Sequence, residues 1–310
     1  MIDFIKILCR ISHRFGKKET EAAEVIEHEL SSHKIPFHKQ PFKTAVPICI
    51  KAELKADGRN VPCLGASLIS GSIPDGKYII SAFGYSGERN PYNINYNPVS
   101  DQISVIDFSR VPSVTVSRLA IPKLVMAKKV TGRVVVNKQV FTSQNMLLGN
   151  SKNPKNIVFA HYDSVVGDGA LDNAGGVSVM LNAFLEKPEL LDRTLFVFAG
   201  NEEVSYDDYK NKSGFGFRVF ESQYSHLLSN SEMIIVIDGV GIGEPLFSQN
   251  ALQWALQVKI LDKIKDKVFW LQNDQRKVFQ LLHTKGDTVD HLEEKHLEAA
   301  CNALVKKLIA

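Results

Sequence analysis

The stretch IVFAHYDSVVGDGALDNAGG, residues 157–176, decides the fold class. It opens with four consecutive apolar residues and passes at once into polar and glycine-rich sequence. Two further apolar runs, TLFVFA at 194–199 and MIIVI at 233–237, have the same character, and helix-length segments separate the three. Unbroken apolar runs of this length indicate strands buried on both faces of a parallel sheet. The pattern predicts an α/β protein, a three-layer α/β/α sandwich with a mostly parallel central sheet.

Polar residues follow each of the three apolar runs directly. His161 and Asp163 follow the first run, Glu202 and Glu203 follow the second, and Asp238 follows the third. Loops converge at the carboxyl ends of parallel strands, and ligand sites of such sheets lie there. We therefore expect these side chains to share one edge of the sheet.

Two further candidates lie away from these strand ends. Asp172 stands where a loop turns into a helix, and both of its carboxylate oxygens can point outward to bridge two metals. His283 follows the short apolar run VFQLL and precedes a turn and a long amphipathic segment. Imidazole nitrogens and carboxylate oxygens are the ligands of hydrolytic two-zinc sites. Asp287 and Asp290 are explained by turn formation and by capping of the last helix.

Five segments in this order resemble the signatures of a zinc aminopeptidase family that also contains glutamate carboxypeptidases and glutaminyl cyclases. The resemblance covers residues 1–44 and 140–310. It implies the zinc exopeptidase fold and a metal-dependent exopeptidase, most simply an aminopeptidase that hydrolyses N-terminal residues of peptides through a water activated by two Zn²⁺ ions. The segments are HYDS (161–164), LDNAGG (171–176), NEE (201–203), the strand-terminal Asp238 and HTKGDTVD (283–290).

The resemblance also divides the candidates between catalytic residues and ligands. Glu202 matches the general base, and Asp163 matches a carboxylate that orients a histidine ligand. A zinc-bound imidazole donates its second N–H to a fixed acceptor, which Asp163 can supply. Neighbouring strand residues project to opposite sides, so we expect that Glu202 and Glu203 do not face the same metal. The implied metal ligands are His161 and Asp238 for one zinc, Glu203 and His283 for the other, and Asp172 between them.

Residues 45–139 differ in character from the catalytic part, which is expected to comprise 1–44 and 140–310. Short runs such as CIKAEL, KYIISAF (77–83) and ISVIDF alternate with turn signals such as GERNPYN (87–93), as is typical of β structure. The end of the segment, VPSVTVSRLAIPKL, is similar to the end of a protease-associated domain. We predict an inserted β-rich domain that restricts access to the metal site.

Composition and charge exclude several classes of partner. The 310 residues are 44% hydrophobic and 23% charged, as in folded water-soluble proteins. The net charge of +3 comes from scattered basic residues, so nucleic acid is not an expected partner. Asp3 and Lys6 interrupt the first apolar segment, and no stretch reaches the roughly 18 apolar residues of a membrane span. We expect peptide substrates, no membrane association and a cytoplasmic location, and the sequence leaves a homo-oligomer open.

The four cysteines show no spacing typical of a zinc site. Free buried thiols are the expected state in a reducing compartment. A disulfide between Cys49 and Cys63 is the minor alternative.

Alternative functions remain on the same fold. A glutaminyl cyclase uses a single zinc, and the presence of His161 beside His283 argues against it. A carboxypeptidase needs a basic group for the terminal carboxylate of its substrate, and Arg218 is a candidate. A non-catalytic binding relative is expected to lose ligands, and none is missing here. Trp254 and Trp270 either line a substrate pocket or pack in the core.

Overall fold

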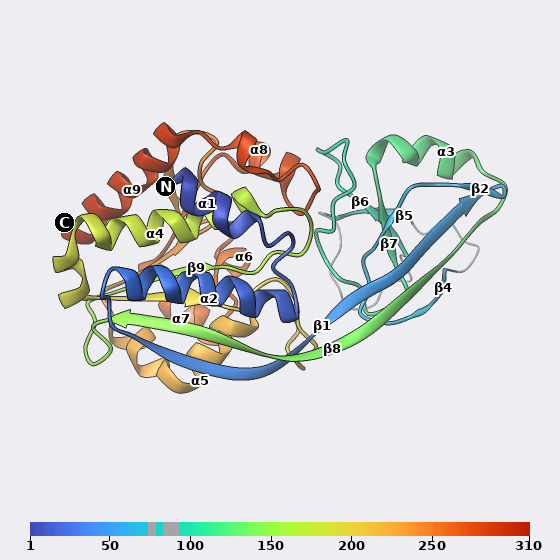
Figure 1. The fold of residues 1–310 in the computed structure, drawn as a ribbon. Helices are drawn as coiled ribbons and strands as arrows, with labels where there is room; N and C mark the ends of the chain where they lie inside the picture. Colours follow the sequence, from blue (N-terminus) through green and yellow to red (C-terminus); the bar gives the residue numbers. More distant parts are fainter. Residues whose placement is uncertain (74–78, 83–92) are drawn as a thin grey trace.

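The computed structural model describes residues 1–73, 79–82 and 93–310. Most of the turn predicted at 87–93 lies outside these residues, as do both ends of the strand predicted at 77–83. The chain forms a larger part and a smaller module, and two long strands run from one into the other (Figure 1).

A sheet of nine strands, counted over the described residues, forms the centre of the larger part. Four neighbouring strands in its middle, in the order β13–β11–β9–β10, are parallel. The three apolar runs of the sequence form β9 (Asn156–His161), β10 (Thr194–Ala199) and β11 (Met233–Ile237), so the strand predictions are confirmed. The remaining strands are antiparallel to their neighbours. On one side, β13 (Val268–Gln272) pairs with β12 (Leu246–Ser248). On the other, β10 is followed by β8 (Val130–Gly149), β1 (Phe37–Ala56) and β2 (Arg59–Asn60), and β4 (Gly71–Ile73) pairs with β8.

Helices cover both faces of this sheet, which confirms the predicted three-layer sandwich. Alternate residues of β9 enter two separate cores: Val158 and Ala160 belong to the first core, and Ile157 and Phe159 belong to the second core. Burial on both faces is the physical reason why the strands are continuously apolar. The first core is closed by α1 (Ile2–Cys9), α2 (Lys17–Ser32), α4 (Gly175–Glu186) and α9 (Glu294–Ile309), and the second by α5 (Phe215–Asn230), α6 (Leu252–Ala255) and α7 (Leu261–Ile264).

The two N-terminal helices pack on the larger part. Ile5 and Leu8 of α1, and Ile26 and Leu30 of α2, are buried in the first core. This packing supports the assignment of residues 1–44 to the catalytic part. None of the helices in the described ranges is long and apolar enough to cross a bilayer.

The smaller module is β-rich and has a hydrophobic core of its own. Among the residues of the module that the structure describes, four strands form a sheet in the order β3–β7–β6–β5. The core also includes Leu54 and Val130, which lie at the far ends of β1 and β8. The elements of the module are β3 (Leu64–Gly65), β5 (Ile79–Ser81), β6 (Ile94–Tyr96), β7 (Val114–Val116) and α3 (Ile121–Met126).

The strands β1 and β8 pair along almost their whole length and join the two parts. The boundaries expected after residues 44 and 139 fall on the same stretch of this ladder, where Thr44 lies opposite Phe141 and Ala45 opposite Val140. Phe141 also belongs to a small core in which residues of both parts meet. We therefore propose that the boundary between the larger part and the module crosses β1 and β8 at this position. Both strands continue across the boundary without a break.

The cysteines are free thiols in the structure. Cys9 and Cys301 are buried in the first core, as expected. Cys49 is exposed on β1, contrary to the expectation of buried thiols, because it lies on the long strand pair between the two parts.

Glu19 is a buried carboxyl group on α2. It accepts a hydrogen bond from Ser143 Oγ through Oε1, and its Oε2 has no hydrogen-bond partner in the described part of the chain. Burial raises the pKa of Glu19 well above its usual range, and the charge of Asp163 adds to this effect. A glutamate whose pKa is higher in the folded than in the unfolded state lowers stability at every pH above its unfolded pKa, about 4.3.

We expect Glu19→Gln to raise the melting temperature at pH 8 by roughly 2–4 °C, the shift that about 1 kcal/mol produces in a domain of this size. The two proteins should melt together near pH 3, where the glutamate is protonated in both states. Thermal unfolding between these pH values measures the difference. Glu21→Gln, at an exposed position of the same helix, is the control. A lower midpoint for Glu19→Gln at pH 8 would show instead that the ionised carboxylate stabilises the fold.

Candidate metal centre

The carboxyl ends of β9, β10 and β11 meet at one edge of the sheet, as predicted. β9 ends at His161, β10 ends three residues before Glu202, and β11 ends directly before Asp238. A cavity of about 440 Å³ opens at this edge. Six of the seven predicted site residues line it: His161, Asp172, Glu202, Glu203, Asp238 and His283.

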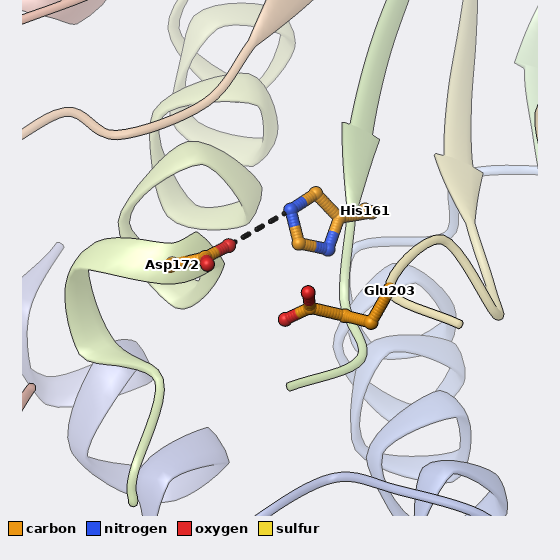
Figure 2. A group of neighbouring side chains, drawn as sticks. All are labelled: His161, Asp172 and Glu203. Atoms are coloured by element: carbon orange, nitrogen blue, oxygen red, sulfur yellow. Dashed lines mark ion pairs between the residues drawn. The ribbon is translucent and has the colours of Figure 1, made fainter. Parts of the chain in front are cut away.

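Asp172 lies between the two histidines. Its Oδ1 is 3.0 Å from His161 Nε2, and its Oδ2 is 2.8 Å from His283 Nε2. Asp238 Oδ1 lies 3.8 Å from His161 Nε2, and Glu203 Oε2 lies 2.7 Å from His283 Nε2. Figure 2 shows His161, Asp172 and Glu203 converging, and one ligand atom of each lies within 4.8 Å of the others. Each of the two carboxylate oxygens of Asp172 thus lies beside a different histidine.

This donor set fits divalent cations. The side chains of Asp172 and Glu203 are only 5% and 4% exposed. In the described ranges, no lysine or arginine forms an ion pair with the carboxylates of Asp172, Glu203 or Asp238. Glu203 Oε1 and His161 Nδ1 also lack hydrogen-bond partners there. Buried carboxylates need compensating positive charge, and zinc binds the nitrogen and oxygen ligands that the site presents.

Burial and neighbouring charges shift the pKa values of these groups. Burial disfavours the charged imidazolium of His161, but the nearby carboxylates of Asp163 and Asp172 outweigh this effect and raise its pKa well above the usual range. Burial raises the pKa of Glu202 well above its usual range. The charge of His161 lowers this pKa, and the charge of Glu203 raises it further. Burial, together with the charge of Asp172, raises the pKa of Glu203 to about 7. The raised pKa of Glu202 lies in the direction expected of a carboxylate that accepts a proton during catalysis.

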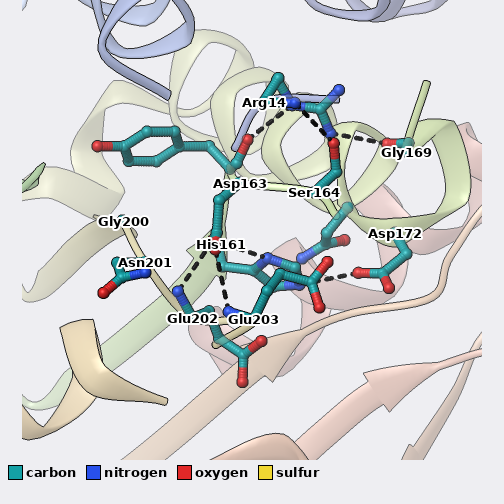
Figure 3. A network of polar contacts seen from close by, with 12 residues as sticks. Arg14, His161, Asp163, Ser164, Gly169, Asp172, Gly200, Asn201, Glu202 and Glu203 are labelled. Atoms are coloured by element: carbon teal, nitrogen blue, oxygen red, sulfur yellow. Dashed lines mark hydrogen bonds and ion pairs between the residues drawn. The ribbon is translucent and has the colours of Figure 1, made fainter. Parts of the chain in front are cut away.

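Asp163 positions the loop that carries both glutamates. Its Oδ1 accepts a hydrogen bond from Glu202 N, and its Oδ2 accepts one from Glu203 N, both at 3.0 Å. Oδ1 also lies 3.4 Å from His161 Nδ1 (Figure 3). One buried carboxylate therefore fixes two backbone N–H groups and faces the ring of His161.

Glu202 and Glu203 do not alternate across a strand. β10 ends at Ala199, and Asn201 has a positive φ of 50°, so the pair lies in the loop that follows. Both side chains line the cavity, and the premise that they alternate as neighbouring residues of a strand is wrong. They differ instead in their contacts: Glu203 Oε2 lies against His283 Nε2, whereas no ion pair joins Glu202 to a histidine in the described residues.

Asp287 is a residue of the site that the sequence did not single out. It is buried, and its role is not that of a simple turn or capping residue. Its Oδ1 accepts a hydrogen bond from Leu171 N at 2.7 Å, and its Oδ2 accepts one from Asp172 N at 3.1 Å. Asp287 therefore fixes the backbone of Asp172, the residue whose carboxylate lies between the two histidines. The segment HTKGDTVD contains it, but nothing local in the sequence distinguishes it from a turn residue.

Arg14 was also not expected at the site. Its side chain is fully buried, and Nε donates to Tyr162 O at 2.7 Å while an Nη atom donates to Gly169 O at 2.9 Å (Figure 3). These bonds span the loop between His161 and Asp172. The guanidinium thereby fixes the spacing of two candidate ligands.

The cavity walls decide two questions that the sequence left open. Trp254 and Trp270 both line the cavity, and Trp270 also packs in the second core. Arg218 does not line it. Its guanidinium lies 2.9 Å from Asp207 Oδ2 and donates to Ser213 O at 2.6 Å. The basic group considered for a carboxypeptidase is therefore used to hold the loop that follows Glu203.

The inserted module contributes to the cavity wall. Ile106, Asp107, Phe108 and Arg110 line the cavity beside the candidate ligands. Burial raises the pKa of Asp107 to about 6. This placement supports the prediction that the module restricts access to the site.

The chain combines an α/β/α fold with a histidine–carboxylate cluster at the strand ends. Within it, residues 145–268 match the model of Peptidase family M28. This match confirms the resemblance that the sequence motifs indicated. No curated protein matches the chain.

Several solved structures share the fold over almost the whole chain. BSAP, a zinc aminopeptidase from Bacillus subtilis, has a TM-score of 0.67 at 18% identity, over 98% of this chain and 92% of that chain. The aminopeptidase from Aneurinibacillus sp. strain AM-1 has a TM-score of 0.65 at 16% identity, over 99% and 92%. The Porphyromonas gingivalis glutaminyl cyclase has a TM-score of 0.54 at 13% identity, over 99% and 96%. At these identities the likeness establishes the fold alone.

Proposed function

We propose that the protein is an aminopeptidase that binds two Zn²⁺ ions and hydrolyses the N-terminal residues of peptides. The observation that carries this proposal is the position of Asp172, whose two carboxylate oxygens face two different histidines. A carboxylate placed in this way can serve two metals, whereas a single-zinc site needs only one set of ligands. This geometry favours the two-zinc hydrolase over the glutaminyl cyclase alternative.

We assign each side chain of the cluster a task. His161 and Asp238 would hold one ion, Glu203 and His283 the other, and Asp172 both. When bound, zinc lowers the pKa of water toward neutrality and polarises the scissile carbonyl.

Glu202 lines the same cavity and is assigned the role of general base. Its raised pKa suits acceptance of a proton from the attacking water and transfer of that proton to the leaving amine. Asp163 supports this role because it accepts a hydrogen bond from the backbone N–H of Glu202 and so fixes the position of the Glu202 backbone.

Several features favour cleavage at the amino end of the substrate. Arg218 is bound to Asp207 and does not line the cavity. Among the basic residues that do line it, Arg110 donates to the backbone carbonyls of Tyr209 and Lys210, and Lys212 donates to that of Asp207. Two of the structures that share the fold are described as aminopeptidases. The full set of predicted ligands is present in the cavity, which argues against a non-catalytic relative.

The test combines metal analysis with three kinds of substrate. We expect two zinc ions per chain and hydrolysis of leucine p-nitroanilide, which a chelator abolishes and added Zn²⁺ restores. N-acetylated peptides with a free carboxylate should not be cleaved. Cleavage of those peptides would indicate a carboxypeptidase, and cyclisation of an N-terminal glutamine with one zinc per chain would indicate a glutaminyl cyclase. Zinc binding without turnover of any substrate would indicate a binding protein.

A further inference from the structure

The inserted module touches the candidate metal centre through the backbone of Val105. The carbonyl oxygen of Val105 accepts a hydrogen bond from His283 Nδ1 at 2.7 Å, and Val105 N donates to His283 O at 3.1 Å. A carbonyl only accepts, so Nδ1 carries the proton of this bond. A neutral imidazole that donates from Nδ1 presents an unprotonated Nε2, which here faces Asp172 and Glu203.

The same edge of the module caps the helix that precedes His283. Helix α8 (Gln275–Leu281) lies on the side of the larger part that is nearest the module (Figure 1). The last carbonyl groups of a helix have no partners within the helix and need donors from outside. Three side chains of the module, all buried, supply such donors at and just after the end of α8. The bonds are Asn97 Nδ2 to Phe279 O at 2.7 Å, Ser100 Oγ to Gln280 O at 2.8 Å, and Ser104 Oγ to Leu282 O at 2.7 Å.

The backbone of His283 has a conformation that needs contacts from neighbouring segments to hold it. Its φ is +52°, a left-handed conformation that residues other than glycine adopt infrequently. A residue in this region persists where the surrounding structure holds it. The hydrogen bonds of Val105 to the His283 carbonyl and ring hold this residue at both its backbone and its side chain.

We propose that residues 97–105 of the inserted module position His283 for metal binding, so that the module completes the metal centre as well as forming a wall of the cavity. The inference rests on the assignment of His283 as a ligand in the proposed function. It predicts that loosening the module from α8 weakens zinc binding even though no ligand is changed. A deletion of the module would for the same reason remove metal affinity together with any barrier to large substrates.

The test is a graded series of variants in the full-length protein: Ser100→Ala, Ser104→Ala, and Asn97→Ala combined with Ser104→Ala. Ser67→Ala is the matched control, because Ser67 is a buried serine of the same module whose hydroxyl can donate to either of two backbone carbonyls, Ile69 O at 2.7 Å or Val111 O at 3.0 Å. Zinc affinity is measured by competition with a chromophoric chelator. We expect the double variant to bind one zinc roughly 10–100-fold more weakly, the effect typical of losing support behind a ligand, and the single variants to fall between it and the wild type.

Two further measurements separate positioning from general damage to the fold. Thermal unfolding of the metal-free proteins should show similar losses for Ser104→Ala and Ser67→Ala, while only Ser104→Ala changes zinc affinity and the visible spectrum of the Co²⁺-loaded protein. Equal zinc affinities for Ser67→Ala and every member of the series would overturn this proposal and leave the aminopeptidase assignment intact. A wild-type protein that binds no zinc would overturn both.

Discussion

Replacement of Glu202 with Gln is expected to lower turnover by roughly 10²–10⁴-fold, the contribution typical of a general acid–base residue. Glutamine keeps the size and polarity of the side chain but cannot accept the proton of the attacking water. No ion pair joins Glu202 to His161 or His283 in the described part of the chain, so the zinc content should stay that of the wild type. The rate at saturating leucine p-nitroanilide and the zinc content of the same sample measure the two effects.

The pH profile gives a second readout for Glu202. A general base acts in its ionised form, so wild-type kcat/KM should rise with pH through the pKa of this group, and the Gln variant should lack that limb. Glu189→Gln, at an exposed position before the start of β10, is the control and should change neither quantity. Full turnover in the Glu202 variant would exclude the general-base role, and loss of zinc would make Glu202 a ligand.

The features that could be predicted from the sequence are those that depend on neighbouring residues, such as runs of apolar residues and the polar residues that follow them. The strands β9, β10 and β11 are buried on both faces, so each appears as an unbroken apolar run. Parallel neighbours end at the same edge, so the positions of His161, Glu203 and Asp238 followed from the strand ends alone. The fold class and the gathering of these side chains were therefore accessible before any coordinates.

The features that could not be predicted depend on contacts between distant segments. Asp287 holds Asp172 from 115 residues away, and Val105 holds His283 from 178 residues away. The second contact is made by a backbone carbonyl, which every residue type possesses, so no sequence pattern can mark it. The path of the Glu202–Glu203 loop likewise depends on the Asp163 carboxylate, which accepts both of its N–H groups.

These contacts give the inserted module a role beyond that of a barrier to substrates. The sequence indicated only that residues 45–139 are β-rich and precede the strand that ends at His161. The structure places part of this segment against α8 and His283. Access to the cavity and the geometry of a candidate ligand are thereby controlled by the same module.

Replacement of Glu203 with Gln is expected to have the opposite outcome to that of Glu202. Glu203 Oε2 lies 2.7 Å from His283 Nε2, so the variant loses an anionic ligand of the zinc that we assign to His283. That zinc should bind more than about 100-fold more weakly, beyond the roughly 10–100-fold typical of losing a group behind a ligand. Activity should return in part when excess Zn²⁺ is supplied, because the base and the remaining ligands are intact.

The comparison of the two variants tests the division of labour directly. Glu202→Gln should keep its zinc and stay inactive at any zinc concentration, whereas Glu203→Gln should lose zinc and respond to its addition. The reverse pattern would mean that the two roles are exchanged, which the shared loop and the shared Asp163 carboxylate would permit. Wild-type activity and zinc content in both variants would remove the case for a metallopeptidase at this site.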